Sequence, residues 1–258
     1  MLLRKTTISL IAASAVLSGA ALAQDYYISL SGGLNFQNSS DNAGVFVGPF
    51  TTGTGTTIPG GTVLPDGTDV GWNTEFENGY VINGAIGRKY DAFRGELEVS
   101  YQSAGVETHT GVSTAGIALD NEDAGVLITG SPNLGVSVGD LVAAGEGSLD
   151  TVYVMANFLV DIKTGTRFTP YIGAGAGVGF VDVNYSPSAT PIIDDNATAF
   201  AYQGKAGIAF QAAPGTEIFA GYRYRATTDV NVDASLFAAN FDIENKSSIV
   251  EAGVRFTF

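Results

Sequence analysis

The sequence lacks cysteine, has one histidine, and holds only 12 Lys and Arg against 26 Asp and Glu in 258 residues. Without cysteine the chain forms no disulfide, no thiolate metal site and no cysteine nucleophile. A net charge of −14 argues against a nucleic-acid partner, because phosphate binding requires clustered Lys and Arg. We therefore expect no nucleic-acid binding and no cofactor.

A long apolar run occurs only at the start of the sequence. Arg4 and Lys5 precede an apolar segment that ends in the small-residue pattern ALA at 21–23, as in a secretory signal peptide. We predict a cleaved signal peptide over 1–23 and an exported domain over 24–258. No later stretch approaches about 18 consecutive apolar residues, so any further contact with a membrane must be made by strands.

Apolar and polar residues alternate with a period of two in eight later segments. In the first segment, for example, Ile28 and Leu30 alternate with Ser29 and Ser31. This period is typical of β-strands with two different faces. The predicted strands are 26–36, 80–87, 93–102, 151–161, 170–181, 200–211, 217–225 and 250–258. Eight is an even number, as a closed antiparallel membrane barrel requires.

The connections between these strands alternate in length. Short turns are predicted near 89–91, 163–166 and 213–216, and long loops over 38–75, 103–149, 184–197 and 226–244. This asymmetry is typical of outer-membrane barrels. The fold prediction is all-β: an eight-stranded antiparallel up-and-down transmembrane β-barrel with short periplasmic turns and long extracellular loops. We expect the loops, which are rich in Gly, Ser, Thr, Asn and Asp, to be mobile.

The charged residues on the strands distinguish a membrane barrel from a soluble barrel such as a lipocalin, whose outer face must be polar. Here the polar face carries a balanced set of charges, which suits a lumen. The cations are Arg94, Lys205, Arg223, Arg225 and Arg255, and the anions are Glu96, Glu98, Asp161, Glu217 and Glu251. We predict a structural ion-pair network that plugs the lumen, formed by Arg94, Glu96, Glu98, Lys205, Arg223, Arg225, Glu251 and Arg255. A conducting channel is the alternative.

Aromatic residues mark both ends of the predicted strands, as expected for rings at headgroup depth. The short-turn end carries Tyr26, Phe93, Phe168, Phe210, Phe256 and Phe258. The long-loop end carries Phe36, Tyr80, Tyr101, Phe180, Tyr202 and Tyr224.

Three motifs carry a family resemblance: PYIGAGAGVG at 170–179, GYRY at 221–224 and GVRFTF at 253–258. With them the sequence resembles the eight-stranded outer-membrane barrel domains of Gram-negative bacteria, a group that includes the transmembrane part of OmpA and the opacity and porin-like surface proteins. The resemblance implies location in the cell outer membrane. It also implies that Phe256 and Phe258 form an assembly signal read by the barrel-assembly machinery.

Two loop motifs suggest other chemistry. His109, with Glu107 and Ser113 nearby, could form the Ser-His-acid set of a lipid-cleaving enzyme, but we expect a solvated loop histidine. Asp120, Glu122 and Asp123 partly match a calcium loop and lack its further ligands. We expect at most weak binding of divalent cations by the acidic loops.

The sequence therefore predicts a non-enzymatic integral outer-membrane surface protein that supports envelope integrity and presents acidic extracellular loops. Its expected partners are outer-membrane lipids and, during biogenesis, the assembly machinery. Two alternatives stay open: a porin-like channel for small solutes, and a loop-mediated adhesin.

Overall fold

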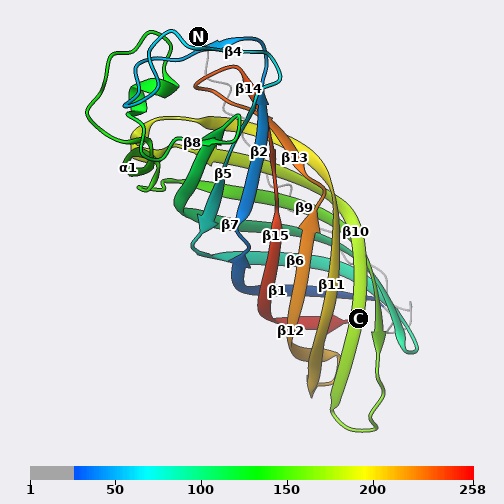
Figure 1. Ribbon diagram of the computed structural model, residues 1–258. Coiled ribbons are helices and arrows are strands. Elements are labelled where there is room, and N and C mark those ends of the chain that lie inside the picture. Colours follow the sequence, from blue (N-terminus) through cyan, green and yellow to red (C-terminus); the bar gives the residue numbers. More distant parts are fainter. Residues whose placement is uncertain (1–25) are drawn as a thin grey trace, which may run out of the picture.

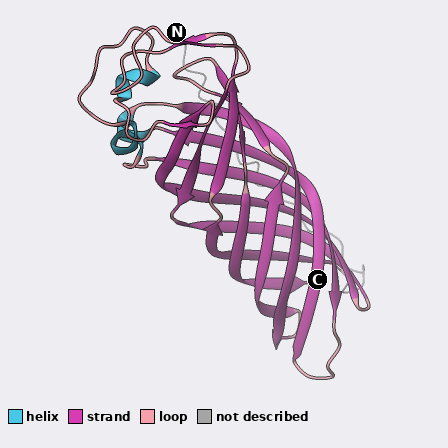
Figure 2. Ribbon diagram, in the orientation of Figure 1, coloured by secondary structure: helices cyan, strands magenta, loops and turns pink. Residues whose placement is uncertain are grey.

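The computed structural model describes residues 26–258 (Figure 1), so the predicted signal peptide over 1–23 lies outside the described residues. Strands dominate the molecule, and the helical segments gather at one end of it (Figure 2). Within 26–258, no helix is long and apolar enough to cross a membrane.

Eight antiparallel strands form a closed ring. They are β1 (Tyr26–Gln37), β6 (Asn78–Tyr90), β7 (Phe93–Thr114), β9 (Gly147–Asp161), β10 (Phe168–Tyr185), β11 (Ile193–Ala213), β12 (Thr216–Thr227) and β15 (Lys246–Thr257). The order around the ring is β6-β1-β15-β12-β11-β10-β9-β7, and β7 pairs back to β6. The prediction of an eight-stranded antiparallel barrel is confirmed.

The outer surface of the ring is apolar where a bilayer would contact it. On β7, for example, Leu97 and Val99 point outward, whereas Glu96 and Glu98, which alternate with them, are buried inside. Aromatic side chains border this belt at both ends. Those at the short-turn end include Phe93, Phe168, Phe256 and Phe258, and those at the other end are Phe36, Tyr80, Tyr101, Phe180, Tyr202 and Tyr224, all of them exposed. This belt is the lipid-facing surface that the alternation of apolar and polar residues predicted.

The long connections contain regular secondary structure that the sequence did not indicate, and their mobility stays a prediction. They contain the strands β2 (Ser40–Phe46), β3 (Phe50–Thr51), β4 (Val63–Leu64), β5 (Asp69–Phe76), β8 (Ile117–Ala118), β13 (Val230–Asp233) and β14 (Ala239–Ile243). Three short helical segments accompany them: the 3-10 helices η1 (Ala124–Leu127) and η2 (Pro187–Ala189), and the α-helix α1 (Val138–Val142). We call this region beyond the belt the cap; it lies at the end of the barrel opposite the short turns (Figure 1).

The cap continues the wall of the barrel. Strands β13, β14, β2 and β5 pair side by side and join the upper part of β7, while β10 and β11 extend upward on the other side. A bridge between Ile193 and Ala234 links β11 to the segment that follows β13. Alternate residues of the cap strands point into this upper ring, among them Val70, Trp72 and Phe241, and they form the main apolar core. Burial of that core explains why these segments form strands and short helices.

Candidate functional site

Glu98 lies at the centre of the lumen and contacts cations from the opposite wall. Its strand, β7, is four places from β12 around the ring, so Arg223 and Arg225 reach it across the full width of the barrel. Arg225 Nη2 lies 2.9 Å from Glu98 Oε1, Arg223 Nη1 contacts the same oxygen, and Lys205 Nζ lies 2.9 Å from Oε2. The side chains of Glu98, Arg223 and Arg225 are at most 2% exposed.

Glu96 and Arg94 continue the network towards the short-turn end. Arg94 Nη1 lies 3.2 Å from Glu96 Oε1, and its Nε donates to Asp161 Oδ1 at 2.9 Å. The Tyr27 hydroxyl donates to Glu96 Oε1 at 2.7 Å. Lys205 Nζ is 3.5 Å from Glu96 Oε2 and so connects the two glutamates of β7.

Glu251 and Arg255 of β15 have different partners. Both oxygens of Glu251 accept hydrogen bonds of 2.9 Å from Arg223 Nη2. Arg255 instead pairs with Glu217 of β12, the residue opposite it in the strand register. The structure thus joins seven of the eight predicted network residues directly and places Arg255 in a neighbouring pair.

Neutral side chains complete the network, and we did not assign them a role from the sequence. Gln203 Oε1 accepts from Arg223 Nη1 at 3.1 Å and from Arg225 Nε at 3.0 Å. Asn83 donates to Glu251 at 2.9 Å and accepts from the Ser100 hydroxyl at 2.6 Å. These residues share the inward parity of the charged ones, and that parity is the signal that would have identified them.

Two further layers lie above the ionic layer. Gln37, Gln102 and Asn245 form an uncharged amide layer, in which Gln102 Nε2 donates to Gln37 Oε1 and Gln37 Nε2 donates to Asn245 Oδ1, both at 3.2 Å. Above it, Leu149 and Val183 belong to the apolar core of the cap. The cavity within the ionic layer measures about 10 Å³, room for about one water molecule. The described part of the lumen is therefore filled.

His109 is not the solvated loop histidine that we expected. It lies on the upper part of β7, is 2% exposed, and packs against Trp72 and Tyr185. A register shift near Phe76 lets β7 turn Glu107 outward while His109 points into the core. The structure therefore does not bring the Glu107 carboxylate to the His109 ring. Sequence periodicity could not reveal the change of parity, because an irregularity in strand pairing produces it.

Glu122 and Asp123 organise the backbone of the cap. Glu122 accepts hydrogen bonds from the hydroxyl and N–H of Thr57, and Asp123 accepts from the N–H groups of Gly125, Leu134 and Gly135. Burial by itself would raise the pKa of Glu122, but the hydrogen bonds from Thr57 lower it. The N–H of Leu134, with those of Gly125 and Gly135, lowers the pKa of Asp123.

These bonds occupy the carboxylates that we considered as calcium ligands. Among residues 26–258, no group of three or more His, Cys, Asp or Glu side chains is arranged to hold a metal ion. Weak binding of divalent cations by the acidic loops stays a prediction.

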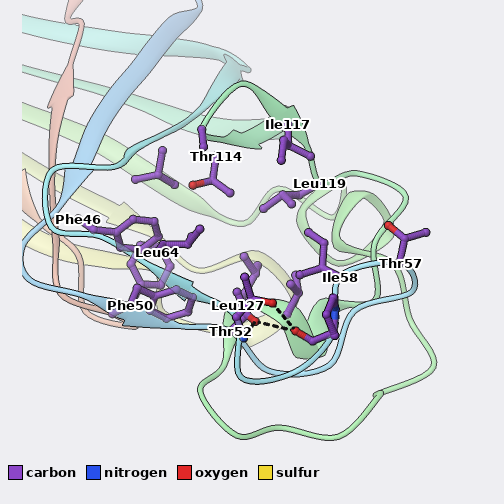
Figure 3. Close-up of a pocket in the computed structure, with 16 residues that line it drawn as sticks. Phe46, Phe50, Thr52, Thr57, Ile58, Leu64, Thr114, Ile117, Leu119 and Leu127 are labelled. Atoms are coloured by element: carbon purple, nitrogen blue, oxygen red, sulfur yellow. Dashed lines mark hydrogen bonds between the residues drawn. The ribbon is translucent and has the colours of Figure 1, made fainter.

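An apolar pocket of about 250 Å³ opens in the outer part of the cap. In Figure 3, Phe46, Phe50 and Leu64 lie on one side of it, and Ile58 and Leu119 lie on another. The phenyl rings of Phe46 and Phe50 stack with their centroids 4.8 Å apart. The pocket draws its lining from several long connections, so the separate segments gave no signal of it in the sequence.

The last residues of the chain close the ring. Phe256 lies on β15, and the N–H of Phe258 donates to the carbonyl of Tyr26 at 2.9 Å. Both side chains are exposed on the outer surface. Their role as an assembly signal stays a prediction.

A closed ring of eight antiparallel strands with an apolar outer belt and short turns at one end defines an outer-membrane β-barrel of the Gram-negative type. A family model described as surface antigen matches residues 65–258. The chain belongs to this family, and the outer membrane is its location.

Solved structures of other outer-membrane proteins resemble the chain over most of its length. Neisserial surface protein A is 14% identical, with 90% of this chain and 97% of that chain covered and a TM-score of 0.47. The outer membrane protease OmpT from Escherichia coli is 11% identical, with 93% of this chain and 99% of that chain covered and a TM-score of 0.42. OprG from Pseudomonas aeruginosa is 11% identical, with 91% of this chain and 96% of that chain covered and a TM-score of 0.44. No curated protein sequence matches the chain.

Proposed function

We propose that this protein is a non-enzymatic structural barrel of the outer membrane, which supports envelope integrity and presents a folded acidic cap at the cell surface. The observation that carries the proposal is the position of Glu98, which binds Arg223, Arg225 and Lys205 across the lumen. These contacts tie opposite walls of the barrel together and occupy its bore. They support a structural role over a channel.

The surface of the cap supports the second part of the proposal. The long connections carry Asp and Glu but no Lys or Arg, so the cap presents negative charge. Such a surface keeps a displayed domain soluble and disfavours binding of anionic groups. Membership of a surface antigen family agrees with display at the cell surface.

Conductance of the purified, refolded protein in planar bilayers tests the sealed lumen. We expect little conductance from the wild type. Glu98→Gln leaves three buried cations without a shared carboxylate, so it should cause leak events and lower the free energy of unfolding by about 3–5 kcal/mol. The matched control is Asp91→Asn, which removes an exposed partner of Lys163 at the short-turn end and should behave as wild type.

A large, steady conductance of the wild type would contradict the structural role and favour the channel. The envelope role has its own test in cells that lack the protein. These cells should release a periplasmic reporter at lower detergent concentration, and the full chain should restore resistance. Equal detergent sensitivity with and without the protein would contradict that part of the proposal.

A further inference from the structure

A groove of about 350 Å³ lies on the outer surface of the barrel, where the apolar belt ends and the cap begins. One row of outward side chains on neighbouring strands lines it. Tyr101 of β7 pairs with Val152 of β9, and Val152 pairs in turn with Phe180 of β10. Both aromatic rings belong to the row that borders the belt. Because valine is short, a slot remains between the two rings, and we call this groove the slot.

The slot is continuous with the surface that contacts lipid. Neighbouring strands lie about 4.8 Å apart, so the strands that carry Tyr101 and Phe180 are separated by roughly 10 Å. Directly below Val152, the belt continues with the outward residues Val154 and Val178, which are partners in the β9–β10 register. An apolar floor thus runs from the slot into the belt. A hydrocarbon chain that lies against the belt can therefore extend upward between the rings.

Two carboxylates lie side by side at the upper end of the slot. Asp150 and Asp182 are direct partners in the β9–β10 register, one outward position above Val152 and Phe180. Asp150 accepts from the Tyr101 hydroxyl at Oδ1 and from the Ser148 hydroxyl at Oδ2, both at 2.7 Å. The side chain of Asp182 has no hydrogen bond or ion pair with any residue of 26–258. Like charges directly opposite each other destabilise a sheet, so a positive group beside both carboxylates would remove a cost.

The described chain supplies no such positive group at the slot. Strands β7, β9, β10 and β11 carry no outward Lys or Arg, and their basic residues Arg94 and Lys205 point into the lumen. A bound metal ion is a poor candidate as well, because no group of three or more His, Cys, Asp or Glu in residues 26–258 is arranged to hold one. A ligand that fills the apolar slot and also carries the positive charge satisfies both parts of the site.

We propose that the slot binds a lipid of the outer leaflet whose headgroup carries a primary ammonium group. One hydrocarbon chain lies over Val152 between the two rings, and the ammonium donates hydrogen bonds to Asp150 and Asp182. An ammonium has three N–H donors, enough for both carboxylates. The carboxylates lie just above a row of interfacial aromatic residues, which is the depth of lipid headgroups. The site adds a specific lipid to the structural role of the barrel and does not depend on a sealed lumen.

Native mass spectrometry of the refolded full-length barrel in detergent measures lipid binding directly. The titrants are phosphatidylethanolamine, phosphatidylcholine and phosphatidylglycerol, each with two myristoyl chains. The first two carry the same phosphate and a positive nitrogen, but only the nitrogen of phosphatidylethanolamine has N–H donors. We expect phosphatidylethanolamine to bind about fivefold more tightly than phosphatidylcholine, because hydrogen bonds between charged groups are the stronger ones. Anionic phosphatidylglycerol should bind most weakly.

Two variants test the headgroup contact and the slot separately. Asp182→Asn keeps the size of the side chain but removes its charge, so the preference for phosphatidylethanolamine over phosphatidylcholine should fall below about twofold. Its matched control is Asp233→Asn, at an exposed position of β13 in the cap, which should keep the preference. Val152→Phe fills the slot and should weaken binding of all three lipids by about fivefold. Its control is Val250→Phe, at an exposed outward position of β15, which should bind as wild type.

Each part of the proposal can fail independently. Equal affinity of the wild type for phosphatidylethanolamine and phosphatidylcholine, or an unchanged preference in Asp182→Asn, would overturn recognition of the ammonium group. Tighter binding of phosphatidylglycerol, with or without Mg²⁺, would overturn the cationic headgroup. Wild-type affinities in Val152→Phe would overturn the slot. Gel mobility without heating verifies that each variant is folded, and Asp182→Asn, which changes no volume, keeps the test available if Val152→Phe does not refold.

Discussion

Charged residues in the barrel interior are buried beside residues of opposite charge. Glu98 is nearly inaccessible, and its charge is compensated by Arg223, Arg225 and Lys205. Such a buried carboxylate is stable only because the cations and neutral donors around it replace water. His109 illustrates the opposite case, since it is a buried ring with one nitrogen hydrogen-bonded to Thr74 and no hydrogen-bond partner for the other among residues 26–258.

We predict that His109 makes the cap sensitive to acid. Burial lowers the pKa of His109 to about 4, below its ordinary value near 6.5. Between these values the unfolded chain binds a proton that the folded cap does not, so stability is present above pH 6.5 and is lost as pH falls towards 4. The loss should reach roughly 3 kcal/mol.

Urea unfolding followed by Trp72 emission measures this effect at pH 7.5 and pH 4.5. Carboxylates also titrate in this range, so the relevant quantity is the difference between wild type and His109→Phe, which keeps an aromatic ring. The variant should lose less stability than wild type over the same pH interval. If the free energy of unfolding depends on pH identically in the two proteins, His109 does not contribute to the loss of stability in acid.

The strands are the elements that connect membrane and cap. Four barrel strands are joined to a cap strand by only a few residues. These pairs are β1 and β2, β5 and β6, β12 and β13, and β14 and β15. Strand β7 crosses from one part to the other without interruption, and its inward side chains change from Glu96 and Glu98 to Ala104 and Val106. One strand thus contributes to an ionic layer below and an apolar core above, because successive inward positions lie at different depths.

We predict that glycine is required on the inward face of β11 but not on its outward face. A Cβ at Gly207 would lie 2.5 Å from the Ala220 carbonyl oxygen and from the Tyr171 hydroxyl, whereas a Cβ at Gly204 has nothing within 4 Å. Gly207→Ala should lower the free energy of unfolding by about 1–3 kcal/mol through overcrowding. Gly204→Ala, the matched control on the same strand, should be neutral within about 1 kcal/mol.

Denaturant unfolding of the two variants in lipid vesicles, followed on gels that separate folded from unfolded barrel, provides the measurement. If both variants unfold at the same denaturant concentration as wild type, the lumen has room at Gly207 and the close approach of Tyr171 is not required.

At the scale of the whole molecule, charge is divided among three regions. The lumen contains cations and anions in contact, the belt is apolar, and the cap carries acidic residues on connections without Lys or Arg. The basic residues nearest the short turns include Lys163, whose side chain is 61% exposed. From this distribution we expect the two ends of the barrel to differ in sensitivity to trypsin, which cleaves after Lys and Arg.

We predict that trypsin leaves the protein uncut on intact cells and cleaves at Lys163 after the outer membrane has been opened. The cap connections offer no trypsin site, Lys246 at the cap end of β15 lies in a strand paired with β12, and the turn that contains Lys163 lies at the opposite end. Leu134→Arg, which places a basic residue at an exposed position of the cap, is the positive control and should be cut on intact cells. Cleavage at Lys163 on intact cells would mean that the barrel is inserted with the opposite orientation.

The membrane-spanning parts of the strands, their inward and outward faces and the lipid-facing belt were predictable from the sequence, because each follows from a period of two within about ten consecutive residues. The same period also identified Glu98 and Arg223 as lumen residues. The folded structure was needed to show that Glu98 binds cations of the strand directly opposite, that Arg255 pairs with Glu217, and that His109 is buried in the core of the cap. These features join residues far apart in the chain, and local periodicity contains no information on which distant segments meet.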